Sequence, residues 1–192
     1  MEASDRELLI RYRSGHIEAL EDLIERYRRP LFGFIINMSQ GRDEADEIFQ
    51  EVWLRVIRKH KKYKHGNFCG WLVQIARNVI IDRSRRRKPE LSLDEENKEG
   101  ASLGQTIAGK EPGPATMLAS RDLGAKMAEA VNTLSPDQKE VFLMRVQAEL
   151  SFKEIAAMQK VSINTVLARM QYALSKLRTM LEEDYQELTK TV

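Results

Sequence analysis

The chain has 192 residues, of which 42% are hydrophobic and 31% charged, with a formal net charge of +2. This length and apolar content suffice for one medium domain or two small ones. A single cysteine excludes a disulfide framework and a multi-thiolate zinc site. The polar, acidic start MEASDREL does not resemble a signal peptide, and no apolar run approaches the roughly 20 residues of a membrane span. We therefore expect a soluble, cytoplasmic protein.

The charged residues fall into blocks. Residues 55–87 hold 11 basic side chains and one acid, whereas residues 43–51 hold five acids and no base. Adjacent blocks of opposite sign suggest two partners of opposite polarity, a polyanion and a basic surface. The alternative is an ordinary solvated surface, which usually explains scattered charges.

Helical periodicity runs through most of the chain, and capping boxes mark helix starts at Ser4, Ser135 and Ser151. Pro30 is expected to break or kink the helix that contains it. Residues 88–119 hold three of the five prolines and read as an irregular acidic linker. We expect an all-α fold in which two small helical domains, 1–87 and 120–185, are joined by this flexible linker.

The acidic block lies on a predicted helix over 43–58. Five apolar residues share one arc of this helix and form a core stripe, whereas most of the acids lie on the opposite arc; the stripe consists of Ala45, Ile48, Phe49, Val52 and Val56. The acidic arc could dock on a basic partner helix. Taken alone, however, the pattern favours an ordinary amphipathic surface helix.

A second predicted helix covers 68–86. Its core stripe consists of Phe68, Leu72, Ile75, Ala76 and Val79, and a neighbouring face carries Trp71, Gln74, Asn78, Ile81 and Arg85. Unpaired bases need aromatic surfaces, amides that read base edges and cations along the backbone, and this face supplies all three. The alternative, that Trp71 completes the core and the arginines only solubilise the helix, is equally compatible with the sequence.

Residues 135–181 have the spacing of a helix-turn-helix, with helices over 135–147, over 151–159 and from Ser162 onward. In the last helix the core stripe is Val166, Met170, Ala173, Leu174 and Leu177; the opposite face and its flank carry Asn164, Ala168, Gln171, Tyr172, Ser175, Thr165, Arg169 and Lys176. A small, polar, basic face suits a major groove. A helical hairpin with a polar exterior is the alternative.

Enzyme chemistry has no support in the sequence. His60, His65 and Cys69 lack a fourth ligand for zinc, and neither a phosphate-binding loop nor a dinucleotide fingerprint occurs. We expect no catalytic residue, metal, cofactor or small-molecule substrate.

Four stretches in this order resemble bacterial RNA polymerase sigma factors of the extracytoplasmic-function type. They are RDEADEIFQEVWLRV (42–56), GWLVQIARNVIIDRSRRR (70–87), NTLSPDQKEVFLMR (132–145) and SFKEIAAMQKVSINTVLARMQYALSKLR (151–178). The resemblance implies a sigma factor that binds core RNA polymerase and directs promoter recognition and strand opening. It also implies a possible anti-sigma partner.

The resemblance assigns three sets of residues. The polymerase-binding set is Asp43, Glu44, Asp46, Glu47, Gln50 and Glu51. The set that binds and melts the minus-ten element is Lys61, Lys62, Tyr63, Lys64, Trp71, Gln74, Arg77, Asn78, Arg83, Arg85, Arg86 and Arg87. The set that binds the minus-thirty-five duplex is Ser162, Asn164, Thr165, Ala168, Arg169, Gln171, Tyr172 and Lys176, with Arg169 its best-matched member.

Three positions depart from the family pattern. Lys160 stands where the turn usually has Gly, Gln159 where Leu is typical, and Leu167 where a Lys often contacts DNA. Since a non-Gly residue in a left-handed turn costs on the order of 1 kcal/mol, the turn is expected to close differently.

Two rival functions make different predictions. A self-sufficient helix-turn-helix regulator would bind duplex DNA tightly without polymerase. A purely protein-binding adaptor would show no salt-dependent affinity for DNA.

Overall fold

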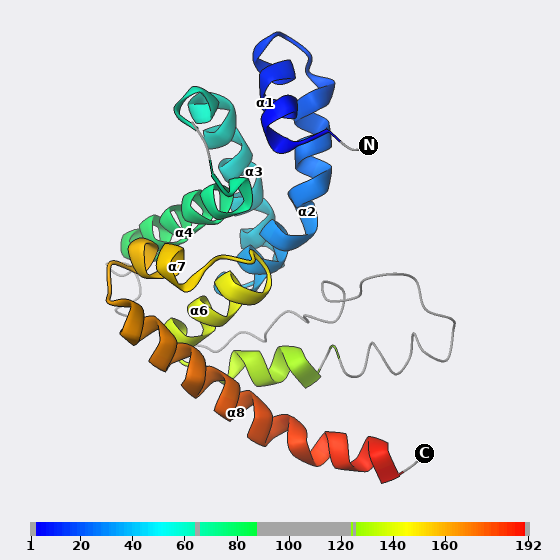
Figure 1. Ribbon diagram of the computed structural model, residues 1–192, viewed down its shortest axis with the longest axis vertical. Helices are drawn as coiled ribbons and strands as arrows, with labels where there is room; N and C mark the ends of the chain where they lie inside the picture. The colour runs from blue at the N-terminus through cyan, green and yellow to red at the C-terminus, as the bar shows by residue number, and fades with distance from the viewer. Residues whose placement is uncertain (1–2, 64–65, 88–123, 125, 191–192) are drawn as a thin grey trace. The chain divides into compact units, whose positions relative to one another are not determined.

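The computed structural model describes residues 3–63, 66–87, 124 and 126–190, with side chains as far as Glu182 (Figure 1). Within these ranges all regular secondary structure is helical, and the chain divides into two compact units, Met1–Glu99 and Gly100–Val192. The predicted all-α fold with two helical parts is confirmed. The predicted linker 88–119, Lys64 and His65 lie outside the described residues.

The first unit begins with α1 (Asp5–Arg13), which packs beside α2 (Glu18–Met38), as Figure 1 shows. The predicted capping box is present, since the Ser4 hydroxyl accepts a hydrogen bond from the Glu7 amide. Asp5 ties the two helices together: it accepts hydrogen bonds from Arg26 over 2.7 Å and from the Tyr27 hydroxyl over 2.5 Å. Burial and this carboxylate raise the pKa of Tyr27 well above its usual range.

Pro30 lies inside α2, which continues for another two turns. Of the two outcomes predicted for Pro30, a break or a kink, the break is wrong. Pro30 removes one backbone donor and its ring crowds the preceding turn. The residues that follow nevertheless form part of the core, since Leu31, Phe34 and Ile35 are completely buried. Burying such side chains contributes about 1.5–3 kcal/mol each, which outweighs the loss at the proline.

The first unit is completed by α3 (Arg42–Lys59), the short 3-10 helix η1 (His60–Lys62) and α4 (Phe68–Arg87). Both α3 and α4 pack against α2 and against each other. The predicted core stripe of α4 is entirely buried, and that of α3 is buried except for Phe49, which is half-buried. The side-chain amide oxygen of Asn67 caps α4 by accepting a 3.0 Å hydrogen bond from the Gly70 amide.

The second unit contains helical residues 126–132, α6 (Pro136–Val146), α7 (Phe152–Gln159) and α8 (Ile163–Lys190). The capping boxes at Ser135 and Ser151 are present, and α6 and α7 both pack against α8. Val166, Ala173 and Leu177 of α8 are buried as predicted. The other two predicted core residues are not enclosed: Met170 is half-buried, and 48% of Leu174 is exposed.

The turn between α7 and α8 adopts the geometry expected of a glycine although it contains Lys160. Lys160 has φ 56° and ψ 42°, and the Val161 amide donates to the Ala156 carbonyl over 3.1 Å. This closes α7 as a left-handed cap. The expectation that the turn would close differently is therefore wrong: the lysine adopts the strained conformation and the helix-turn-helix keeps its shape.

Replacing Lys160 by glycine should remove that strain. We expect Lys160→Gly to stabilise the second unit by about 0–1 kcal/mol, because relief of about 1–2 kcal/mol in the folded state is partly offset by the greater freedom of glycine in the unfolded chain. Lys160→Val, which is β-branched, should destabilise it by more than about 1 kcal/mol.

Urea unfolding of the full chain, followed by circular dichroism, measures both effects. Trp53 and Trp71 both lie in the first unit, so their fluorescence reports that unit alone and should be unchanged. Destabilisation by Lys160→Gly would contradict the strained turn.

Candidate nucleic-acid interface

One face of α4 carries the side chains predicted to contact unpaired bases. Gln74, Asn78 and Arg85 are exposed, and Trp71 and Ile81 beside them are half-buried. Successive members lie three or four residues apart, so they form a single strip along the helix. The strip offers an aromatic ring, two amides and a cation to solvent.

Trp71 belongs to a cluster of aromatic rings at the start of this strip. Its ring centroid lies 5.2 Å from that of Tyr63 and 5.6 Å from that of Phe68. Phe68 is buried and contacts Tyr27, whereas Trp71 remains partly accessible. Trp71 therefore packs on the core with one side and keeps another side accessible, so both alternatives left open by the sequence describe part of its environment.

Hydrogen bonds and a ring contact from α1 hold the loop before α4 in place. Arg13 donates to the carbonyl oxygens of His60, over 2.5 Å, and Tyr63, over 3.0 Å, and the ring of Tyr12 meets that of His60 edge-on. Lys61 and Lys62 are exposed on this loop. Burial raises the pKa of the Tyr63 phenol, whose hydroxyl donates to the Gly66 carbonyl. The two lysines therefore lie on a loop that is held by hydrogen bonds, beside the aromatic cluster.

A cavity of about 460 Å³ lies between this loop and α1. Its lining includes two cations, Arg6 and Arg13, one carboxylate, Asp5, the ring of Tyr63 and the apolar side chains of Leu9 and Ile10. It therefore combines an excess of one positive charge with apolar and aromatic surface.

Salt bridges join the acidic side of α3 to the end of α4. Arg83 donates to Glu47 over 2.8 Å and to Glu51 over 3.1 Å, and Glu51 also accepts a 2.5 Å hydrogen bond from Arg55. Burial alone would raise the pKa of Glu51, but the hydrogen bonds from Arg83 and Arg55 outweigh it and hold that pKa below its ordinary value of 4.5.

Arg87 is bound in the same way, by Glu44 over 2.8 Å and by the side-chain oxygen of Gln40 over 3.0 Å. The neighbouring Arg85 and Arg86 are exposed and have no partner among the residues that the structure describes. The predicted cations of α4 thus divide into bound and free ones. Arg77 is half-buried and makes its own interactions.

The predicted polymerase-binding set also divides into half-buried and exposed residues. Glu44 and Glu51 are half-buried against α4, whereas Asp43, Asp46, Glu47 and Gln50 are exposed. Two apolar residues that the sequence reasoning missed continue this exposed face toward the end of α3: Leu54 is 52% exposed and Ile57 is 38% exposed. Leu54 follows Gln50 by four residues and Ile57 follows Leu54 by three, and this helical spacing was the signal that could have identified them. The exposed face of α3 is therefore acidic at its start and apolar at its end.

In the second unit, α8 presents a polar face to solvent. Asn164, Ala168, Gln171 and Tyr172 are exposed, and Tyr172 is 67% exposed. Ser162 caps the helix by accepting a 3.1 Å hydrogen bond from the amide of Thr165, which is half-buried. Lys176 is exposed, but its amine donates to the Thr133 carbonyl over 2.6 Å.

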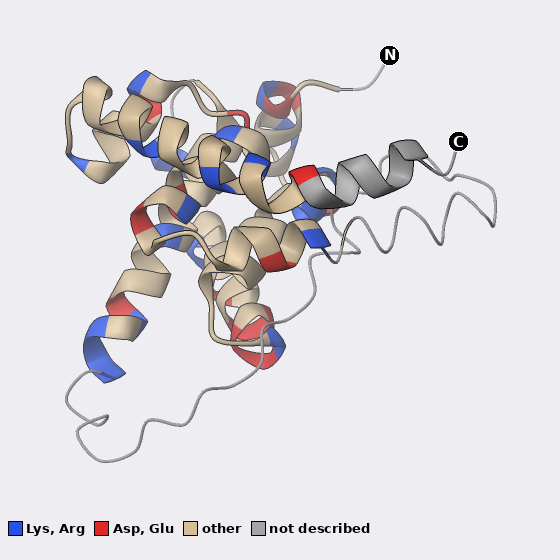
Figure 2. Cartoon of the chain, turned by 90° about the horizontal axis from the view of Figure 1, so that it is seen from below, with Lys and Arg blue, Asp and Glu red and all other residues tan. Residues whose placement is uncertain are grey.

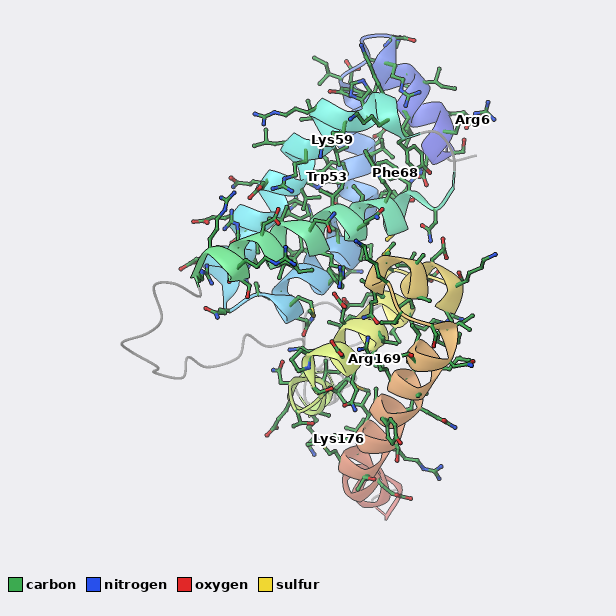
Figure 3. The ribbon with its side chains drawn as sticks, turned by 90° about the vertical axis from the view of Figure 1, so that its left-hand side faces the viewer. Arg6, Trp53, Lys59, Phe68, Arg169 and Lys176 are labelled. Atoms are coloured by element: carbon green, nitrogen blue, oxygen red, sulfur yellow. The ribbon has the colours of Figure 1, made fainter. Side chains whose placement is uncertain are left out.

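Arg169, like Lys176, is bound within the unit, and its guanidinium has two side-chain partners. It donates to the Gln159 side chain over 2.7 Å and pairs with Asp137, and only 23% of its side chain is exposed. Gln159 in turn donates to the buried Glu140 over 2.5 Å. Figure 3 shows Arg169 between α8 and α6. The four side chains form a network that links α6, α7 and α8, and the sequence did not predict it.

Both units of the chain match known protein families. Residues 23–90 match the family profile of Sigma-70 region 2, and residues 125–177 match that of Sigma-70, region 4. ECF RNA polymerase sigma factor SigW of Bacillus subtilis is 25% identical over 95% of this chain and 100% of its own length. This chain is an extracytoplasmic-function member of the sigma-70 family. The predicted resemblance is confirmed.

Other sigma factors share this likeness. RNA polymerase sigma factor CarQ of Myxococcus xanthus is 28% identical over 90% of this chain and 95% of its own length. The sigma factor RpoE of Bartonella quintana, solved in complex with the anti-sigma factor NepR, superposes with a TM-score of 0.67 at 23% identity, over 84% of this chain and 96% of that one. This structural likeness supports the sigma-factor fold.

No group of three or more His, Cys, Asp or Glu side chains among the described residues is placed to hold a metal ion. No helix in the part of the chain that the structure describes is both long and apolar enough to cross a membrane.

The paired Glu51 predicts a specific dependence of stability on pH. Because the folded-state pKa of Glu51 lies below 4.5, its ionised form stabilises the fold above about pH 4.5, and this contribution is lost as the pH falls through the folded-state value. Glu51→Gln should lower the unfolding free energy at neutral pH by about 1 kcal/mol or less and flatten its decline below pH 4.5.

Tryptophan fluorescence during urea unfolding measures this at pH 7 and at several acidic values. Asp46→Asn, which alters an exposed acid on the same helix, is the matched control and should keep the wild-type profile. Identical pH profiles for Glu51→Gln and the wild type would contradict the importance of the Arg83 and Arg55 pairs.

Proposed function

We propose that this sigma factor binds bacterial core RNA polymerase and directs promoter recognition and strand opening at the start of transcription. The observation that carries the proposal is that both matched sigma regions present solvent-exposed side chains of the required chemistry. The chain acts as a non-catalytic specificity subunit in the cytoplasm, with no small-molecule substrate.

The strip on α4 is proposed to hold the unpaired strand of the minus-ten element. Trp71 offers a surface on which a base can stack, and Asn78 and Gln74 offer amides for base edges. Lys61, Lys62, Arg85 and Arg86 are the exposed cations that can follow the backbone. The cavity beside Tyr63 could receive a base that has left the stack, since its cationic and aromatic lining suits a nucleotide.

The exposed face of α3 is proposed to dock on a basic surface of the polymerase. Asp43, Asp46 and Glu47 supply the charge, which steers and orients the encounter. Leu54 and Ile57 supply apolar area next to the acids, and such mixed surfaces are typical of interfaces in which affinity comes from an apolar centre.

The helix-turn-helix of the second unit is proposed to place α8 in the major groove of the minus-thirty-five element. Two modest DNA contacts and the contacts with polymerase reinforce one another when they are joined in one chain. Free chain should therefore bind promoter duplex weakly, whereas the holoenzyme should bind it strongly.

An anti-sigma factor is a further proposed partner. Two solved sigma factors that this chain resembles in fold, RpoE of Bartonella quintana and CnrH, were crystallised with NepR and with the cytosolic domain of CnrY, respectively. Such a partner would compete with polymerase if it covered the exposed face of α3.

Run-off transcription tests the proposal directly. Purified full chain and bacterial core polymerase are incubated with a pool of templates that carry random promoter sequence. We expect the chain to co-elute with core polymerase and to start transcripts at templates that share a two-part element. Absence of both, or tight duplex binding without polymerase, would contradict the proposal.

Trp71→Ala should impair strand opening more than formation of the closed complex. Loss of one stacking surface costs about 1–3 kcal/mol, or roughly 5- to 150-fold in the opening equilibrium. Trp71→Leu is the matched control, since it keeps apolar bulk against Tyr63 and Phe68 but has no ring. Permanganate reactivity measures opening, and gel mobility at low temperature measures the closed complex. Recovery of opening in Trp71→Leu would show that Trp71 acts only through packing.

A further inference from the structure

The recognition face of α8 is almost free of charge. Between Ile163 and Ser175 the only charged residue is Arg169. Figure 2 shows most of α8 in tan before it reaches the residues that are not described. The other exposed side chains of this stretch end in amides, hydroxyls or hydrocarbon, and the part of this surface that points away from α6 and α7 consists of Asn164, Leu167, Ala168, Gln171, Tyr172 and Ser175.

The guanidinium of Arg169 is bound inside the unit and does not contribute a free charge to this surface. Of its two terminal nitrogens, one is bound to Gln159 and the other to Asp137. The pair of nitrogens that would bind a base edge therefore already has partners. To reach DNA, Arg169 would have to give up its hydrogen bonds to both Gln159 and Asp137, and only 23% of its side chain is exposed. Gln159 also binds the buried Glu140, so the contact with Arg169 is part of the packing of α6, α7 and α8. Breaking hydrogen bonds of a charged group costs free energy that a contact with DNA would have to offset.

The residues that remain define which base pairs can be read. Guanine is read mainly by arginine or lysine at its O6 and N7 atoms, whereas adenine is read by asparagine or glutamine at N6 and N7, and the thymine methyl group by apolar side chains. Asn164 and Gln171 lie seven residues apart on one face, about 10 Å along the helix axis, with Leu167 and Ala168 between them. The face therefore has two adenine readers that flank an apolar patch.

Cations border this face. Lys153 and Lys160 precede it, and Lys176 and Arg178 follow it; all four are exposed, although the Lys176 amine also donates to the Thr133 carbonyl. Placed there, they suit phosphates on either side of a groove, which supply affinity without sequence information.

We propose that α8 reads A·T base pairs in the upstream promoter element: Asn164 and Gln171 each bind an adenine edge, Leu167 and Ala168 contact thymine methyl groups, and Arg169 positions the helix instead of reading a base. This inference rests on the proposed function. It identifies the class of duplex that the second unit selects.

Selection of promoter duplexes by holoenzyme tests the base preference. The full chain with core polymerase is offered fragments whose upstream element is random, at one fixed salt concentration. We expect A·T pairs at the selected positions. Gln171→Ala and Asn164→Ala should each relax the adenine preference at one position by roughly 5- to 150-fold, as expected for loss of a bidentate pair. Replacing a selected thymine by uracil, which lacks the methyl group, should weaken binding by wild type several-fold and binding by Leu167→Ala less.

Arg169 variants separate positioning from reading. Arg169→Ala and Asp137→Ala should reduce binding to all sequences equally, leave every base preference unchanged, and show non-additive losses in the double variant because both break one network. Arg169→Lys and Asp137→Asn provide the same comparison with less disturbance if an alanine variant unfolds. A selected guanine whose preference disappears in an Arg169 variant would overturn the proposal.

Different results would contradict the sigma function of the chain and the A·T preference of α8. If holoenzyme starts transcripts at templates whose upstream element depends on G·C pairs, the sigma function stands and the A·T assignment is wrong. If the chain neither binds core polymerase nor starts transcripts, the proposed function itself fails. Selection of A·T pairs that are unaffected by both Asn164→Ala and Gln171→Ala would also overturn the assignment of these residues.

Discussion

Three partly buried arginines of this chain are each paired with a carboxylate of the same unit. This pairing determines which positive charges remain available to bind DNA. Arg83 and Arg87 bind acids of α3, and Arg169 binds Asp137. The same contacts hold neighbouring helices together. A guanidinium in such a pair is part of the fold, and only cations without one are free to meet a polyanion.

This division changes how the charge blocks of the sequence are understood. The acidic and basic blocks of the first unit do not simply face two different partners, because Glu44, Glu47 and Glu51 bind arginines of α4. The exposed charges of these two blocks that have no partner among the described residues include Asp43 and Asp46 on α3 and the two free arginines, Arg85 and Arg86, at the end of α4. These unpaired charges are the ones proposed to meet the polymerase and DNA, respectively.

The sequence was sufficient for the helices and their buried faces. Capping residues and period-3.6 apolar spacing act within a few residues of each other, so they can be read locally; Ser151, for example, marks α7 as predicted. The predictions that failed depend on contacts between residues that lie far apart in the sequence. Pro30 is tolerated because of packing by distant helices, and the carboxylate partners of Arg83 and Arg169 lie more than 30 positions away. Periodicity identifies the face on which a side chain lies, but it does not reveal what the tertiary fold brings against that face.

The salt dependence of DNA binding by the holoenzyme tests most directly whether carboxylate pairing sorts these arginines. Each phosphate contact contributes about −0.9 to the slope of log K against log salt concentration. The account predicts that Arg85→Ala and Arg86→Ala each reduce the magnitude of the slope by about one on a fixed promoter fragment, whereas Arg83→Ala and Arg87→Ala leave it unchanged. A reduction of the slope by Arg83→Ala and Arg87→Ala as large as that by Arg85→Ala would contradict it.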